Sequence, residues 1–237
     1  MQGRKKLILF SLICLSMGML FHGCSSRDPG QPTEEMYAAQ TAASSSLGII
    51  LMRETECIQD KLVNQDKDGR GEFALLGELA GEIVPRGSSF GTPIKNPLLA
   101  SGYRTGGANG PGYAHRQGYY FRIYLPATPD TAGDDRTLGG TPTRPGPEVR
   151  RDVVNFQEKH FALYAWPQRS GTIPEYALAF FMNESGRIYH QIGTKYIGED
   201  NPPPAEAAYA GPVFTSEIHT SAWKPIYGAE KETGKTF

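Results

Sequence analysis

Cysteine is scarce in this chain, and neither sign of charge is in excess. Three cysteines among 237 residues cannot build a framework of disulfide bonds. A formal net charge of −1 and a pI of about 6.5 leave out the basic surface that nucleic-acid binding requires, so no nucleic-acid partner is expected. Hydrophobic residues make up 39% of the chain, which excludes a wholly disordered protein.

The apolar run near the N-terminus is too short to span a bilayer. It extends over residues 7–21, fifteen positions where a spanning helix needs about 20. Arg4, Lys5 and Lys6 precede it as the positive segment of an export signal. We therefore expect residues 1–23 to be a signal peptide.

The end of this segment resembles the lipobox of bacterial lipoproteins, in which a small residue precedes a lipidated cysteine. Residues 20–24 read Leu-Phe-His-Gly-Cys, with Phe and His at the two positions that depart from the pattern. The resemblance implies lipid on Cys24 and a membrane anchor. In bacterial lipoproteins the residue after the lipidated cysteine governs sorting, and a serine there does not keep the protein at the inner membrane. By this resemblance Ser25 implies a periplasmic or outer-membrane lipoprotein. An ordinary signal peptide cut near Gly23 and an uncleaved anchor are the alternatives.

A lipidated Cys24 would leave Cys57 as a lone thiol in an oxidising compartment. Cys57 stands beside Ile58 within a helical pattern. We expect its thiol to be buried, because a buried free cysteine behaves as a small hydrophobic residue.

A single long helix is predicted over residues 33–64, after a polar linker at 24–32. Its start is marked by Thr33, and Gly69 follows its end. A second short helix is expected over 73–79. The apolar stripe of the long helix, at 3.6-residue spacing, consists of Leu47, Ile50, Leu51, Ile58 and Leu62.

The period of the apolar residues changes to two beyond residue 118, which predicts β-strands. Asn183–Gly186 supplies the turn chemistry of a hairpin between the last two strands. The expected strands cover 119–125, 161–166, 176–182 and 187–192. Together with the long helix they predict an α+β fold, with the helix packed across an antiparallel sheet of about four strands.

Glycine and proline number 28 and 18, and they gather between these elements. Residues 83–117 and 127–151 are therefore expected to be long irregular loops. The expected organisation is one domain over 33–195 with a loop insert at 127–151. Residues 196–237 form an extended C-terminal tail.

Three segments resemble successive strand motifs of a bacterial family of exported domains of unknown function. They are GYYFRI at 118–123, FALYAWP at 161–167 and FMNESGRIY at 181–189. The sequence DKDGRGEF at 66–73 also resembles a turn of pilin-like secreted domains common in planctomycete-type genomes. Over roughly residues 40–195 the resemblance implies a pilin-like helix and sheet. It supplies no catalytic residue.

Oxygen-bearing side chains after the long helix follow the spacing of a calcium-binding loop, with Gly69 at its sixth position. The twelfth position holds Leu75 where that loop has a bidentate Glu, which Glu72 could partly replace. A helix cap and turn, in which the aspartates bond backbone amides, is the alternative that we favour. The candidate calcium ligands are Asn64, Asp66, Asp68 and Glu72.

Two further patterns suggest chemistry. Residues 87–91 match the G-x-S-x-G sequence around a nucleophilic serine, here Ser89, but Pro85 and Pro93 do not suit the strand-turn-helix context that this motif needs. Four residues around the second strand would share one face and could line a pocket, or pack beneath the 127–151 insert. They are Glu158, His160, Tyr164 and Trp166.

The sequence contains no complete catalytic motif. We therefore expect an exported, lipid-anchored protein of the bacterial cell envelope that works by binding or assembly, with another envelope protein as its partner. The alternatives are a calcium-stabilised adhesion or secretion-apparatus module and, less favoured, a serine hydrolase. Calcium is the one cofactor that the sequence suggests.

Overall fold

A long helix and an antiparallel sheet organise the part of the chain that the computed structural model describes. This part comprises residues 33–88, 91–106, 109–128, 130–138, 150–168, 176–193 and 195–226. The helices are α1 (Glu34–Asp60), α2 (Leu76–Leu79) and α3 (Arg151–Gln157), with a 3-10 turn η1 (Ser101–Tyr103). The strands are β1 (Ala114–Arg116), β2 (Tyr119–Thr128), β3 (Thr131–Gly133), β4 (Ala162–Pro167), β5 (Leu178–Asn183), β6 (Ile188–Ile192) and β7 (Lys224–Pro225).

The ends of α1 follow from local chemistry. The Thr33 side chain accepts a hydrogen bond from the Met36 amide, and Glu34 and Glu35 place negative charge in the first turn. Lys61 then takes a left-handed conformation with φ of 54°, which ends the helix. No helix of the described residues is long and apolar enough to cross a membrane.

All strands of the sheet pair antiparallel, in the order β1-β2-β4-β5-β6-β7, with β3 added to the end of β2. The four expected strands correspond to β2, β4, β5 and β6. The hairpin between β5 and β6 has Gly186 at a φ of +70°, as the turn chemistry predicted. Gln117 and Gly118, both with positive φ, form the tight turn between β1 and β2.

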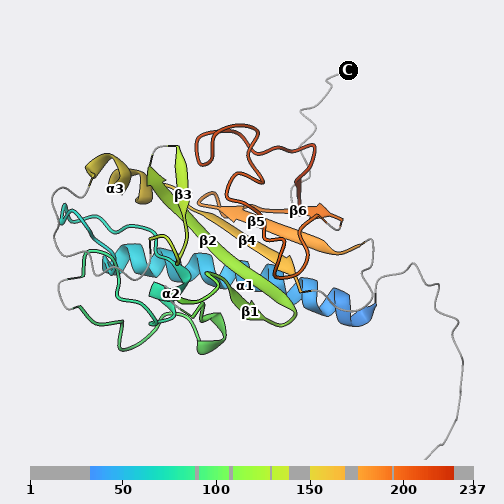
Figure 1. The fold of residues 1–237 in the computed structure, drawn as a ribbon, viewed down its shortest axis with the longest axis horizontal. Coiled ribbons are helices and arrows are strands. Elements are labelled where there is room, and N and C mark those ends of the chain that lie inside the picture. Colours follow the sequence, from blue (N-terminus) through green and yellow to red (C-terminus); the bar gives the residue numbers. More distant parts are fainter. Residues whose placement is uncertain are drawn as a thin grey trace, which may run out of the picture. The chain divides into compact units, whose positions relative to one another are not determined.

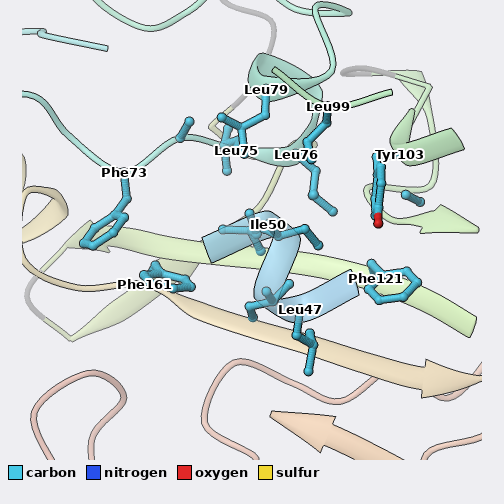
Figure 2. Close-up of a cluster of buried hydrophobic side chains, with 14 of the residues drawn as sticks. Leu47, Ile50, Phe73, Leu75, Leu76, Leu79, Leu99, Tyr103, Phe121 and Phe161 are labelled. Atoms are coloured by element: carbon cyan, nitrogen blue, oxygen red, sulfur yellow. The ribbon is translucent and has the colours of Figure 1, made fainter. Parts of the chain in front are cut away.

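The helix covers one face of the sheet (Figure 1). Leu47 and Ile50 of α1 are fully buried there, while Leu51, Ile58 and Leu62 of the predicted stripe are partly buried against the same cluster. Figure 2 shows the α1 residues between the sheet and the segment that carries α2. The other large members of this first core include Phe73, Leu75, Leu76, Leu79, Phe121, Phe161, Leu163 and Phe180.

The opposite face of the sheet is covered by residues 196–226, here called the C-terminal segment (Figure 1). Trp223 of this segment packs against Tyr164 of β4 and Phe181 of β5. Strand residues therefore alternate between two cores instead of between a core and solvent. The second core also contains Tyr120, Tyr124, Trp166, Tyr189, Tyr196, Tyr209 and Phe214.

The α+β prediction is confirmed, and several details of the fold differ from expectation. The sheet has seven strands instead of about four, because β1, β3 and β7 add short pairings at its margins. The 127–151 segment is not wholly irregular, since it holds β3 and the start of α3. The described part of the tail belongs to the same unit as the sheet instead of lying outside the domain.

Replacing Leu47 by Ala should lower the free energy of unfolding by about 2–5 kcal/mol, because Leu47 is 0% exposed and its loss opens a cavity in the first core. Met52 on the same helix is 67% exposed, so Met52→Ala should change stability by less than about 0.5 kcal/mol. Urea denaturation followed by circular dichroism measures both. Equal effects would mean that α1 does not pack on the sheet through Leu47.

Candidate functional site

The loop after α1 contains the turn that the sequence offered as an alternative to a calcium loop. Asp66 Oδ1 accepts a hydrogen bond from the Asp68 amide at 3.1 Å, and Asp68 Oδ1 accepts one from the Arg70 amide at 2.7 Å. These bonds use one oxygen of each carboxylate. Each aspartate therefore keeps a second oxygen for another partner.

The predicted ligand Glu72 does not join the two aspartates. Its side chain is buried, and its carboxylate accepts hydrogen bonds from the backbone amide and the side-chain amide of Gln65. The third carboxylate near Asp66 and Asp68 is Glu158, which follows α3. One oxygen of each of these three residues, called the carboxylate cluster below, lies within 4.8 Å of the others. The side-chain oxygen Oδ1 of Asn64, the remaining predicted ligand, is buried and has no hydrogen-bond partner among the described residues.

The four residues predicted to line a pocket do not share one strand face, as that prediction assumed. They are Glu158, His160, Tyr164 and Trp166. Glu158 is the C-terminal cap of α3 and His160 lies in the connection to β4, so neither shares a strand face with the other two. Tyr164 and Trp166 are fully buried in the second core. The Tyr164 hydroxyl donates to the Ala205 carbonyl, and the Trp166 indole nitrogen donates to the Gly198 carbonyl, both at 2.8 Å. These side chains hold the C-terminal segment on the sheet.

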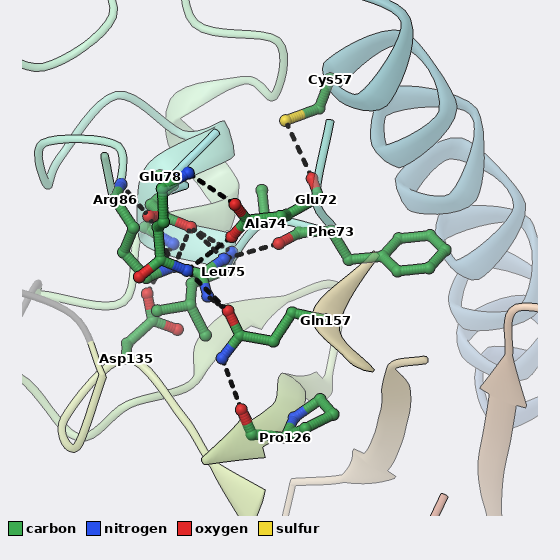
Figure 3. A network of polar contacts seen from close by, with 12 residues as sticks. Cys57, Glu72, Phe73, Ala74, Leu75, Glu78, Arg86, Pro126, Asp135 and Gln157 are labelled. Carbon is green, nitrogen blue, oxygen red and sulfur yellow. Dashed lines mark hydrogen bonds and ion pairs between the residues drawn. The ribbon is translucent and has the colours of Figure 1, made fainter. Parts of the chain in front are cut away.

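A network of buried polar side chains lies on the other side of the sheet (Figure 3). At its centre, Glu78 of α2 pairs with Arg86, at 3.0 Å between Oε1 and Nε. Arg86 also donates to Gln157 Oε1 of α3 and to the Phe73 carbonyl, each at 2.6 Å. The buried network, defined by its charged and amide side chains, comprises Glu54, Glu72, Glu78, Arg86, Asp135 and Gln157.

The carboxylates of the buried network replace backbone partners for the segment around α2. Glu54 accepts from the Ala74 amide at 2.8 Å, and Glu78 accepts from the Leu75 amide at 2.7 Å. Asp135 accepts from the Gly77 amide at 2.7 Å. This approach is so close that a Cβ at position 77 would lie 2.6 Å from Asp135 Oδ1, so a larger residue there would have to displace the carboxylate. The buried network thus holds the segment around α2 in place inside the protein.

Burial disfavours the ionised form of several of these carboxyl groups. It raises the pKa of Asp135 to about 7 and raises the pKa of Glu54 well above its usual value, since the neutral form costs less to bury. Glu54 Oε1 and Asp135 Oδ2 have no hydrogen-bond partner, which favours protonation of both groups. Outside the buried network, burial and the negative charges of Asp68 and Asp66 also raise the pKa of Glu158.

The remaining predicted site residues divide into two groups. Cys57 is a free and fully buried thiol, as expected, and burial raises its pKa, so it is not a reactive group. Cys24 and Ser89 lie outside the described residues.

A shallow polar pocket of about 330 Å³ opens beside the second core. The sequence did not indicate it. Glu199 and Asp200 lie close to Tyr120, and after burial their negative charges are the causes that raise the pKa of that phenol. His115 Nε2 lies 2.9 Å from Gln168 Oε1 at its rim. The lining of this acidic pocket is Tyr120, Gln168, Ile197, Gly198, Glu199, Asp200 and Asn201.

Comparison of the chain with protein-family models, with curated proteins and with solved structures gave no match. The resemblance to exported pilin-like domains therefore stays a prediction.

The sequence analysis did not predict the buried network or the acidic pocket. The buried network did have a local signal in the sequence. Glu54 interrupts the apolar stripe of α1, and Glu78 interrupts the apolar run at 73–80, so both acids occupy positions that the period assigns to the core. Charged residues are almost never fully buried without partners. In the acidic pocket five of the seven lining residues are the consecutive residues 197–201, and only the fold brings Tyr120 and Gln168 next to them.

Replacing Asp135 by Asn should change how stability depends on pH. The wild-type carboxyl has a pKa of about 7 when folded against 3.8 as the reference value, so the folded state holds a proton that the unfolded state releases. Its stabilising effect is complete below pH 4 and is lost as the pH rises to 7. The stability of Asp135→Asn relative to wild type should rise over that interval, by at most about 1.4 kcal/mol per pH unit, and then level off.

Urea denaturation at five pH values between 4 and 8 measures this difference. Asp152→Asn is the matched control, because the Asp152 carboxylate is exposed and its hydrogen bond with Arg150 lowers its pKa. The control should show no rise between pH 4 and 7. A flat difference for Asp135→Asn would contradict a protonated Asp135 in the folded protein.

Proposed function

We propose that this chain is an exported lipoprotein of a bacterial cell envelope, anchored by lipid on Cys24, and that it works by binding or assembly. The observation that carries the proposal is the order of its N-terminal features: a basic segment, a short apolar run and Gly23-Cys24-Ser25. A polar linker follows, and then the capped start of α1 at Thr33. The pilin-like arrangement of one long helix on an antiparallel sheet is part of this proposal.

The length of the linker limits where the domain can work. Eight residues separate Cys24 from Thr33, and a fully extended chain of this length reaches at most about 30 Å. A lipid on Cys24 would therefore keep the domain close to the membrane surface. Stable anchoring requires more than one acyl chain, which the lipoprotein modification provides.

Partner binding in this proposal takes place at the acidic pocket. Both faces of the central strands are buried in the two cores, so those faces are occupied by the chain itself. The pocket presents the carboxylates of Glu199 and Asp200 next to the ring of Tyr120. Paired carboxylates beside an aromatic ring suit a basic side chain, through charge and cation–π attraction. The proposed partner is an envelope protein that presents such a side chain.

Replacing Cys24 by Ser should abolish lipid attachment and release the protein from the membrane fraction. Mass spectrometry of the N-terminal peptide and fractionation of cells that express the full chain measure the two effects. Cys57→Ala is the control, since its thiol is buried and should not affect anchoring. An unmodified mature N-terminus in the wild-type protein would contradict anchoring by lipid on Cys24.

The double substitution Glu199→Gln with Asp200→Asn should remove a neighbour of the protein in the envelope, because it deletes the negative charge of the acidic pocket. Proximity labelling in intact cells compares this variant with wild type. A control with Glu206→Gln and Glu217→Gln removes two exposed carboxylates elsewhere. We expect a neighbour that wild type and control label and the pocket variant does not. Identical labelling by all three proteins would rule out the pocket as the contact surface.

A further inference from the structure

Two segments about ninety residues apart in the sequence meet at the carboxylate cluster. Asp66 and Asp68 lie in the loop that leaves α1, and Glu158 caps the C-terminal end of α3. One oxygen from each lies within 4.8 Å of the others. Three carboxylates this close repel one another when ionised, unless a positive charge lies between them.

Glu158 gives an independent sign that the cluster is a binding site. Its side chain is only 6% exposed, and its Oε1 atom is buried without a hydrogen-bond partner. A buried carboxylate oxygen that lacks a partner costs free energy. That cost would be removed by a cation bound among the three carboxylates.

The nearby Arg70 does not meet this requirement. Its guanidinium lies 3.7 Å from Glu158 and 4.0 Å from Asp68, and its side chain is 71% exposed. Ion pairs of such exposed groups contribute little, and this one leaves Glu158 Oε1 without a partner. A bound metal ion could displace Arg70 toward solvent at small cost.

We infer that Asp66, Asp68 and Glu158 bind a divalent cation, for which Ca²⁺ is the best fit. All three ligands are carboxylates, the donors that hard cations prefer. Ca²⁺ binds oxygen at about 2.3–2.6 Å, so two oxygens of one shell can lie up to about 4.6–5.2 Å apart, which accommodates the observed limit of 4.8 Å. Mg²⁺, with shorter bonds and a strict octahedron, suits this open arrangement less well.

The ligand set differs from a calcium loop that is continuous in sequence. Two ligands come from the loop and one from a separate helix end, so the bound ion joins the exit of α1 to the end of α3. Asp68 is exposed, which leaves a path for the ion and room for water in its shell. The affinity expected for such a site is that of extracellular calcium modules, with Kd of about 0.1–1 mM. The inference does not depend on the lipid anchor or on the acidic pocket.

Thermal unfolding and calorimetric titration of the full-length protein, purified in detergent and freed of metal by chelation, test this inference. At 10 mM CaCl₂ the Tm should rise by about 5 °C, as expected when ligand is in large excess over Kd. NaCl at matched ionic strength should not reproduce the shift, and MgCl₂ should give a smaller one. The same shift in NaCl would show screening of charge and overturn the site.

The variants Glu158→Gln and Asp68→Asn should each weaken Ca²⁺ binding at least tenfold. Both keep an oxygen in place, and Asp68→Asn retains the acceptor for the Arg70 amide, so the fold should survive. Glu217→Gln, at an exposed carboxylate on the C-terminal segment, should bind Ca²⁺ as wild type does. Calcium binding that is equal in wild type and Glu158→Gln would overturn the assignment, as would the absence of any Ca²⁺ effect up to 10 mM.

Discussion

The buried ion pair between Glu78 and Arg86 is the interaction on which the helix side of this fold depends. Removing two charges from water costs several kcal/mol each, and their attraction offsets this only when the remaining donors and acceptors are also satisfied. Arg86 meets this condition through Gln157 and the Phe73 carbonyl, and Glu78 meets it through backbone amides. The pair thus links α2, α3 and the intervening chain in one arrangement, and the loss of either partner would leave an uncompensated charge in the core.

The sheet imposes a second requirement, because both of its faces are apolar. Phe121 and Leu163 point to the side of α1, whereas Tyr164 and Trp166 point to the side of the C-terminal segment. The two covers are held differently. The helix packs mainly through aliphatic side chains, while the C-terminal segment is tied on by polar tips of aromatic residues. These bonds run from Tyr124 to the Pro203 carbonyl, from Tyr164 to Ala205 and from Trp166 to Gly198.

Sequence reasoning succeeded where a repeating pattern extended over several turns or strand residues. The stripe at Leu47 and Ile50 and the alternation along β2 identified α1 and the sheet. The same alternation could not show that Tyr120 faces a second core, because a half-buried strand and one covered on both sides look alike when the outer residues are aromatic. The short helix α3 has too few turns for a period to be read.

The candidate site was predictable only in its local part. Asp66 and Asp68 are close in sequence, so their spacing identified them, but nothing near them indicates Glu158, which the fold alone brings into contact. Glu72 has suitable spacing in the sequence, but its side chain points into the interior, where its carboxylate accepts a hydrogen bond from the Gln65 amide. A ligand set assembled from distant segments depends on the tertiary fold, and a single sequence does not encode it in any readable pattern.

The second cover follows the strands β2 to β6 in the chain, and this order determines when the domain can be completed. Residues 196–226 are the last of the described residues to be synthesised, and until they emerge the rings of Tyr164, Phe181 and Trp166 have no cover. During that interval the aromatic side chains on one face of the sheet are exposed to solvent. Closure of the second core is therefore a late step, which waits for residues 196–226 even when the helix and the strands have already formed.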